Sequence, residues 1–324
     1  MDFSERFKSD LINLTPSGFE SFALDLFSFQ FQHNRVYNTY CSIRGKSPLN
    51  VTNLTDIPFL PIELYKNHTI KTGDWKEEKW FLSSGTTGSQ RSKLPIRDLH
   101  FYETISKHIF ENKYGKLQNI QILGLLPSYQ EQGHSSLIHM VDSFMKNARN
   151  GSGYFLDGSQ ALIDRLESPD GKKLLVGVSY ALLDFTEDKN CLPVDTFVME
   201  TGGMKGRRKE MVREELHLQL TQALGVPSIH SEYGMTELTS QAYASQVGQF
   251  SFPVWAQALI RDINDPFSYV EPNRTGGINI IDLANVDTCA FIETKDLGRS
   301  AQDGHFEVLG RFDNSDVRGC NLLI

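Results

Sequence analysis

Short apolar runs and longer amphipathic stretches follow one another along the middle of the chain. Runs typical of buried strands occupy residues 79–84, 119–127, 172–180, 195–203 and 225–234. Between them the pattern predicts one helix from Leu99 and another over residues 206–225, in which Gly225 is a typical C-terminal cap. Alternation of this kind predicts a layered α/β fold in which helices cover the sheet.

The two ends of the chain have a different pattern. Near the N-terminus, Phe22, Leu26 and Phe29 recur at helical spacing and predict a helix that packs on the core, with a greasy pocket lining as the alternative. Two prolines in residues 57–61 predict an extended connector. After residue 240, short strands are predicted at 276–283, 289–299 and 304–314. We therefore expect a single large domain over residues 1–324, with an α/β part at 1–240 and a β-rich part at 241–324.

Composition narrows the class of protein. The 324 residues carry a formal net charge of −8, which argues against a nucleic-acid surface because such a surface needs a basic stripe. The sequence has neither the apolar run of a membrane-spanning helix nor an N-terminal secretory signal. Cys41, Cys191, Cys289 and Cys320 are scattered, which favours neither disulfides nor zinc. We expect a cytoplasmic protein without membrane insertion or nucleic-acid binding.

A loop rich in glycine and hydroxyl groups follows the first of the central strands. Small residues let backbone N–H groups approach phosphate oxygens, Ser and Thr hydroxyls add donors, and basic side chains supply positive charge. The spacing is not that of a Walker A loop. The alternative is a flexible surface turn. The candidate phosphate-binding residues are Ser83, Ser84, Gly85, Thr86, Thr87, Gly88, Arg91 and Lys93.

A second candidate segment, SEYGMTE at residues 231–237, follows an apolar run and so lies at a strand end, where α/β folds place their sites. Glu237 could hold Mg²⁺, Thr236 could donate to phosphate beside Gly234, and Tyr233 could stack on a base. The alternative is a turn with a helix-capping Thr.

The third candidate segment is TKDLGR at residues 294–299, followed by GRFD at residues 310–313. An aspartate at a strand end can accept both hydroxyls of a ribose, which makes Asp296 the candidate, and Arg311 could neutralise a phosphate. The alternative is a β-turn with a surface ion pair.

Together and in this order, the three segments resemble the adenylate-forming superfamily of acyl-CoA synthetases, adenylation domains and luciferases. SSGTTGS is similar to its phosphate loop, EYGMTE to its YGxTE motif, and TKDLGR with GRFDN to its ribose-binding segment. Four further stretches, at residues 57–66, 125–142, 200–211 and 318–324, resemble the acyl-protein synthetase branch, which supplies fatty acyl groups to a reductase. The resemblance implies ATP, Mg²⁺ and an acyl-thioester on a cysteine near the C-terminus, where Cys320 stands.

The sequence departs from the superfamily pattern in one respect. Acyl-CoA synthetases continue for about a hundred residues, the size of a small domain, into a lid with a catalytic lysine. This sequence stops soon after GRFD. We therefore expect a fold without the usual C-terminal lid, so that either no lid is needed or a partner completes the site.

The resemblance predicts two chemical steps. A substrate carboxylate attacks the α-phosphate of ATP, with three separated loops converging on one nucleotide, and a thiol then attacks the acyl-adenylate. Cys320 is the candidate thiol, with a small apolar tail residue as the alternative. His134 could orient a carbonyl or be structural, and Lys205 could approach the carboxylate or be a solvated lysine at a helix start.

Two other functions remain open at this point. One is an acyl- or aryl-CoA ligase that uses free CoA in place of Cys320. The other is a degenerate nucleotide-binding or scaffolding subunit without catalysis. For the acyl-protein synthetase, the expected partners are a carboxylic acid, most simply a fatty acid, and an acyl reductase or carrier protein.

Overall fold

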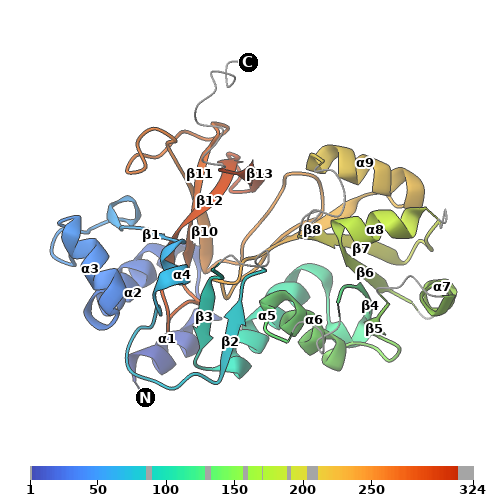
Figure 1. Cartoon of the computed structure of the whole chain (residues 1–324), viewed down its shortest axis with the longest axis horizontal. Coiled ribbons are helices and arrows are strands. Elements are labelled where there is room, and N and C mark those ends of the chain that lie inside the picture. Colours follow the sequence, from blue (N-terminus) through green and yellow to red (C-terminus); the bar gives the residue numbers. More distant parts are fainter. Residues whose placement is uncertain are drawn as a thin grey trace. The chain divides into compact units, whose positions relative to one another are not determined.

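The computed structural model describes residues 2–84, 90–127, 133–155, 160–169, 171–187, 191–202 and 211–312. The chain forms two compact units: Trp75–Pro253 is the first, and Met1–Asp74 together with Val254–Ile324 is the second. We call them the central unit and the terminal unit. The helices and strands of both are labelled in Figure 1.

The central unit is built on a six-stranded sheet in the order β5-β4-β6-β7-β8-β9. The first five strands in this order are parallel, and β9 pairs with β8 in the antiparallel sense. Every residue of β4 and β6 is buried, as expected for parallel strands covered on both faces. The strands are β4 (Gln121–Leu125), β5 (Gly153–Tyr154), β6 (Lys173–Val178), β7 (Thr196–Thr201), β8 (Ile229–Tyr233) and β9 (Ala242–Ala244).

Helices cover the two faces of this sheet (Figure 1). On one face lie α5 (Leu99–Tyr114) and α6 (Ser136–Asn147), and on the other lie α8 (Ser179–Thr186) and α9 (Arg213–Leu224). The Asp98 carboxylate caps α5 by accepting from Phe101 N–H, and Gly225 ends α9 in the left-handed conformation with φ 66°. The unit also contains η3 (Leu117–Asn119) and α7 (Gln160–Glu167).

A separate two-stranded ribbon precedes α5. Its strands are β2 (Lys79–Leu82) and β3 (Lys93–Ile96), paired antiparallel with Lys79 opposite Ile96 and Leu82 opposite Lys93. Phe81 and Leu94 face each other across the ribbon and are buried. The ribbon thus anchors both ends of the glycine-rich segment between its strands.

The terminal unit is built on a sheet in the order β1-β12-β11-β10, with β13 paired to β12. β1 runs parallel to β12, with Leu60 opposite Ile292, so a strand from the first part of the chain completes a sheet made by the last part. The strands are β1 (Leu60–Pro61), β10 (Ala256–Arg261), β11 (Gly276–Asp282), β12 (Phe291–Ser300) and β13 (Phe306–Arg311).

Helices from the first part of the chain pack on this sheet. Phe27 and Tyr37 contact the ring of Phe291 on β12, and all three side chains are buried. The Gln30 side-chain amide donates to the carbonyl oxygens of residues 285 and 286, which ties the helix to the loop after β11. The helices of this unit are α1 (Phe3–Leu11), η1 (Pro16–Gly18), α2 (Phe19–His33), α3 (Arg35–Ile43), η2 (Leu54–Asp56) and α4 (Leu64–Asn67).

The layered α/β prediction is confirmed, and most of the expected strands and helices form near the expected residues. Two details differ. The connector over residues 57–61 contains β1, because Leu60 and Pro61 pair with β12. The stripe of Phe22, Leu26 and Phe29 is also not the most deeply buried face of α2: Leu26 is buried, whereas Phe22 and Phe29 are partly covered by the phenyl rings of α1.

Candidate active site

The candidate phosphate loop is closed at its base by Ser83 and Ser92. Ser83 N–H donates to the Ser92 carbonyl at 3.0 Å, and Ser92 N–H donates to Ser83 Oγ at 2.9 Å. Ser84, Arg91 and Lys93 are exposed beside this closure. The central residues of the segment, Gly85, Thr86, Thr87 and Gly88, lie outside the described residues.

His134 lies against the strand that leads into this loop. Its carbonyl oxygen accepts from Leu82 N–H at 2.9 Å, and its Nδ1 is 3.4 Å from the Trp80 carbonyl oxygen. The side chain is exposed. His134 is thus held at the end of β2 with an accessible ring, which fits a role in orienting a substrate.

A partly buried hydrogen-bonded group of three side chains, which we call the His139 relay, contacts the same strand. His139 on α6 places Nε2 2.9 Å from Glu103 Oε1 and Nδ1 3.2 Å from Lys79 Nζ. Burial and the charge of Lys79 lower the pKa of His139, although Glu103 opposes this. The sequence did not single out this relay, because its three residues lie on three different elements.

The SEYGMTE segment spans the end of β8 and the turn that follows. Tyr233 is 8% exposed and packs against Phe250 and Phe252, and Glu237 is 4% exposed. Gly234 is exposed, and a Cβ added there would lie 2.4 Å from Glu232 Oε1, so only glycine leaves room for the Glu232 carboxyl group. Gln241 Oε1 is buried and has no hydrogen-bond partner among the described residues. A buried acceptor without a partner is the kind of feature that a ligand completes.

Asp296 lies within β12, where it is only 7% exposed, and not in the turn at a strand end that the sequence suggested. It is opposite Arg311 in the register of β12 and β13, and Arg311 Nε is 3.3 Å from Asp296 Oδ1. Its backbone N–H donates to Thr294 Oγ1. The carboxylate is therefore fixed by strand pairing and by one mostly exposed arginine.

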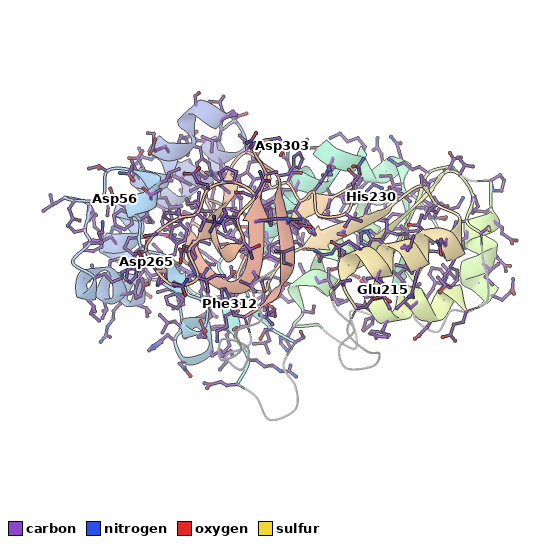
Figure 2. All side chains as sticks on the ribbon, turned by 90° about the horizontal axis from the view of Figure 1, so that it is seen from above. Asp56, Glu215, His230, Asp265, Asp303 and Phe312 are labelled. Atoms are coloured by element: carbon purple, nitrogen blue, oxygen red, sulfur yellow. The ribbon has the colours of Figure 1, made fainter. Side chains whose placement is uncertain are left out.

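A buried arginine supports the same region of the terminal sheet. Arg261 donates to the carbonyl oxygens of residues 278 and 294 and to Asn279 Oδ1, at 2.8 to 3.0 Å. Its guanidinium group lies 5.6 Å from the ring of Phe312, which follows β13 (Figure 2). Burial lowers the pKa of Arg261, which Glu293 partly offsets. Sequence reasoning missed this residue, since nothing in its local pattern predicts that it is buried.

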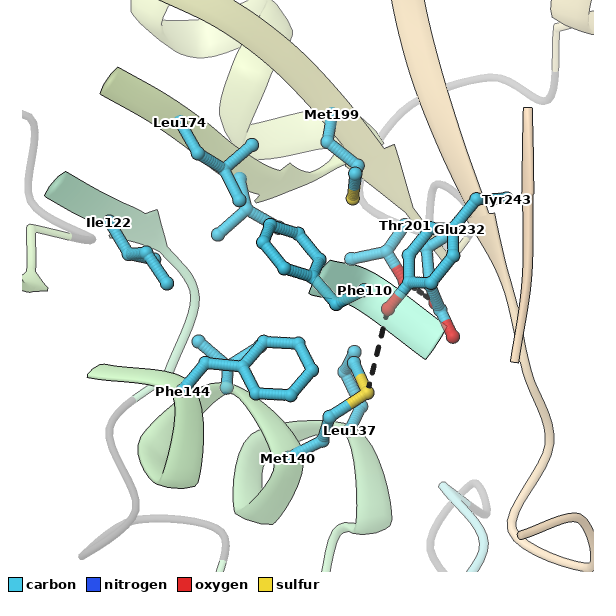
Figure 3. Close-up of a pocket in the computed structure, with 12 residues that line it drawn as sticks. Phe110, Ile122, Leu137, Met140, Phe144, Leu174, Met199, Thr201, Glu232 and Tyr243 are labelled. Carbon is cyan, nitrogen blue, oxygen red and sulfur yellow. Dashed lines mark hydrogen bonds between the residues drawn. The ribbon is translucent and has the colours of Figure 1, made fainter. Parts of the chain in front are cut away.

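A small cavity lies in the central unit between the sheet and helices α5 and α6 (Figure 3). Its volume is about 10 Å³, room for about one water molecule. Ten of the lining residues are apolar or aromatic: Phe110, Ile122, Leu137, Met140, Val141, Phe144, Leu174, Val176, Met199 and Tyr243. The two others are Thr201 and Glu232, which Figure 3 shows together at one end.

The direction of the strands orients this cavity. Ile122 and Leu174 lie near the starts of β4 and β6, whereas Thr201 and Glu232 lie at the ends of β7 and β8. The polar end of the cavity is therefore at the carboxyl edge of the parallel sheet, directly before Gly234. Ligands of open α/β sheets bind at this edge.

Glu200 and Glu232 are carboxylates in opposite settings on neighbouring strands. Glu200 Oε1 is 3.1 Å from Arg213 Nε and 3.6 Å from His217 Nε2. Burial raises the pKa of Glu200, but His217, Arg213 and Ser231 together outweigh burial, so the pKa is lowered overall. Burial raises the pKa of Glu232 to about 7; the hydrogen bond from Thr201 opposes this rise and the charge of Glu200 adds to it. The sequence showed Glu232 in the motif but gave no sign of the cavity.

Two of the candidate catalytic residues, Lys205 and Cys320, lie outside the described residues. The described part of the chain contains no cluster of three or more His, Cys, Asp or Glu side chains that could hold a metal ion. It also contains no helix with the length and apolar character needed to cross a membrane.

Known structures with a similar fold are adenylate-forming enzymes. O-succinylbenzoate coenzyme A synthetase (MenE) from Bacillus subtilis, solved with ATP and a magnesium ion, matches with a TM-score of 0.53 and 19% identity, over 72% of this chain and 49% of that one. A 2-hydroxyisobutyryl-CoA ligase, solved with its acyl-adenylate, matches with a TM-score of 0.65 and 14% identity, over 97% and 69%. The fold is therefore that of the adenylate-forming superfamily, as predicted.

Within this class the sequence identifies a specific family. Residues 14–324 match the family described as "Acyl-protein synthetase, LuxE", and the chain belongs to that family. It is 37% identical over 73 residues to a long-chain-fatty-acid–luciferin-component ligase of Photorhabdus luminescens, a match that covers 22% of this chain and 61% of that protein. The predicted resemblance to the acyl-protein synthetase branch is confirmed.

Proposed function

We propose that this chain activates a carboxylic acid with ATP and transfers the acyl group to a thiol. A carboxylate resists attack because it is negatively charged and has no good leaving group. In the first step a carboxylate oxygen attacks the α-phosphorus of ATP and pyrophosphate leaves. In the second step a thiolate attacks the carbonyl carbon, AMP leaves and a thioester forms.

The observation that carries this proposal is the position of the cavity. Its polar end lies at the carboxyl edge of β7 and β8, next to Gly234. Its other end is apolar and lies deeper between the sheet and two helices. An acid that enters tail first would leave its carboxylate at the edge, where the YGMTE segment lies.

A fatty acid is the substrate class that suits this lining. A cavity of about 10 Å³ cannot hold an alkyl chain, so the side chains around it must move when one enters. Met140 and Met199 are able to do so, because unbranched methionine side chains adopt many rotamers. The Photorhabdus relative, whose name specifies long-chain fatty acids, supports the same class.

Each unit, taken by itself, contains residues that suit a part of ATP. In the central unit, the unpartnered Gln241 Oε1 fits a ligand that supplies a hydrogen-bond donor. In the terminal unit, Asp296 can accept ribose hydroxyls and Arg311 can face a phosphate. Glu237 would hold Mg²⁺, with the other ligands coming from triphosphate oxygens and water; bound there, the ion neutralises phosphate charge.

For the second step we propose Cys320 as the thiol and an acyl reductase or carrier protein as the final acceptor. Lys205 and His134 would help to place the carboxylate, His134 from its position beside β2. The need for ATP fits the cytoplasmic setting predicted from composition.

Exchange of radiolabelled pyrophosphate into ATP tests the first step. We expect exchange that depends on a fatty acid and on Mg²⁺. Intact mass analysis with ATP and the acid should then show a gain of one acyl group that neutral hydroxylamine removes. Nucleotide binding without exchange for any acid would instead indicate a degenerate subunit.

The substitution Cys320→Ser tests the second step, with Cys191→Ser as the matched control because Cys191 is the exposed cysteine among the described residues. We expect C320S to retain pyrophosphate exchange and to lose the acyl mass gain, and C191S to retain both. Formation of acyl-CoA by C320S at the wild-type rate would identify a CoA ligase.

A further inference from the structure

One feature of the cavity is not needed for adenylation. Glu232 places a carboxyl group among apolar side chains, where a methyl or an amide would line the space at lower cost. Its two oxygens have different surroundings. Oε2 accepts a hydrogen bond from Thr201 Oγ1 at 2.5 Å (Figure 3), and Oε1 occupies the space that a side chain at Gly234 would take.

Among the described residues, the elements packed around Glu232 supply no positive charge to it. β7 contributes the Thr201 hydroxyl and, on the opposite face of the sheet, the ionised Glu200. α5 contributes the Tyr102 phenol and β9 the Tyr243 phenol, and burial raises the pKa of both, so both are neutral. α6 lines the cavity with apolar side chains only.

Other basic groups described in the central unit have partners elsewhere. His139 of α6 is held by Glu103 and lies beside Lys79, and Arg213 pairs with Glu200. No ion pair to Glu232 exists within the described part of the chain. Its ionised form is therefore supported by one hydroxyl and opposed by one neighbouring carboxylate.

A bound acyl tail would make ionisation harder still. The tail would displace water from the cavity and surround the carboxyl group with methylene groups, which disfavours the charged form. By linkage, a ligand that binds better to the protonated form takes up a proton when it binds. Glu232 has a pKa of about 7, so this uptake falls in the neutral range.

We propose that Glu232 is a proton-controlled determinant of acid specificity: the cavity accepts long apolar tails when this carboxyl group is protonated and excludes them when it is ionised. Acids too short to pass Glu232 are bound equally well in both states. The inference rests on the proposed function, because it assumes that the acid enters this cavity. It adds regulation by pH of the choice between long and short acids.

The test measures KM for a long acid and for a short acid, tetradecanoic and butanoic, by pyrophosphate exchange from about pH 6 to about pH 9. The ratio of the two KM values cancels the ionisation of ATP and of the substrate carboxylate. For the wild-type protein we expect the long-to-short ratio to rise above about pH 7, by up to about tenfold per pH unit, the limit for one proton.

Glu232→Gln keeps the shape of the side chain and removes its charge. We expect its long-to-short ratio to stay low and flat across the pH range. The matched control is Glu215→Gln on the exposed face of α9 (Figure 2), which should retain the wild-type profile. A flat wild-type ratio, or a Glu232→Gln profile that rises as the wild-type profile does, overturns the inference.

A second variant covers the case in which Glu232→Gln does not fold. Thr201→Val removes the hydroxyl that stabilises the ionised carboxylate. The rise in the ratio should then move to higher pH, and an unchanged midpoint counts against the proposal. Absence of exchange with every acid in the wild-type protein would instead refute the proposed function itself, so the two failures are distinguishable.

Discussion

Ser83 and Ser92 are joined by two hydrogen bonds that close the base of the loop between β2 and β3. One of them links the two backbones, and the other uses the Ser83 hydroxyl as the acceptor. Ser92 is buried, so water cannot readily replace a partner lost there. The ends of the loop are therefore held at a fixed separation by a side chain as well as by strand pairing.

Replacing this hydroxyl should weaken nucleotide binding. We expect Ser83→Ala to raise KM for ATP about fivefold, the effect of losing one hydrogen bond worth about 1 kcal/mol, with little change in KM for the acid. Pyrophosphate exchange at varied ATP concentration measures this. Ser17→Ala, at an exposed serine in the terminal unit, is the control. Equal KM values for S83A and S17A would contradict the prediction.

Asp296→Asn keeps the size of the side chain and removes its charge. The change weakens the pairing with Arg311 and the proposed contact with the ribose hydroxyls. A hydrogen bond to a charged group contributes about 1.5–3 kcal/mol, so we expect KM for ATP to rise by about tenfold or more. The exposed Asp303→Asn, in the turn between β12 and β13, serves as the matched control. Wild-type ATP kinetics in D296N would exclude Asp296 from the nucleotide site.

His230 should make the protein sensitive to acid. Burial, together with Lys113, Lys172 and His217, lowers its pKa from 6.5 to about 4. The unfolded chain thus takes up this proton first as the pH falls, and the contribution of His230 to stability, present above pH 6.5, is lost toward about pH 4.

Urea denaturation at about pH 7.5 and about pH 5 tests this. We expect His230→Gln to lose less stability on acidification than the wild type, by about 1 kcal/mol, since the partly exposed ring is screened by solvent. The exposed His68→Gln should behave as the wild type does. An equal loss in H230Q and wild type would show that His230 does not contribute.

Gly298 is a packing glycine in the strand that carries Asp296. A Cβ there would lie 2.3 Å from the Glu307 carbonyl oxygen and 2.6 Å from Ile278 Cδ1. Because the first of these atoms belongs to the backbone, we expect Gly298→Ala to destabilise the protein by about 1–3 kcal/mol, seen as a lower Tm. Gly153→Ala, whose Cβ would be 3.7 Å from its nearest neighbour, should be tolerated. Equal Tm values for the two variants would contradict this account.

Local sequence predicted well those features that depend on local sequence. Buried parallel strands such as β6 appear as continuous apolar runs, and Gly225 marks the end of α9 because only glycine adopts its positive φ without cost. The predicted helix start at residue 206 is wrong: residues 211 and 212 are not helical, and α9 begins at Arg213. The family was also recognisable, because its motifs are themselves local.

Features made by distant residues could not be predicted in this way. β1 becomes a strand only because Leu60 meets Ile292, and Asp296 lies within a strand because residues 306–311 pair with it. Glu232 looks like any glutamate in a motif until Thr201 and the cavity are placed around it. The roles assigned to individual site residues, including Thr86, Lys205 and Cys320, stay predictions.

The pairing of β1 with β12 affects the order in which the protein can fold during synthesis. The central unit is a continuous segment, Trp75–Pro253, so all of its partners are available once that segment has left the ribosome. The buried faces of α2 and α3 are made first, yet the strands of their sheet other than β1 begin only at Ala256. During that delay the nascent chain carries uncovered phenylalanines, and it is in this interval that we expect chaperones to matter most.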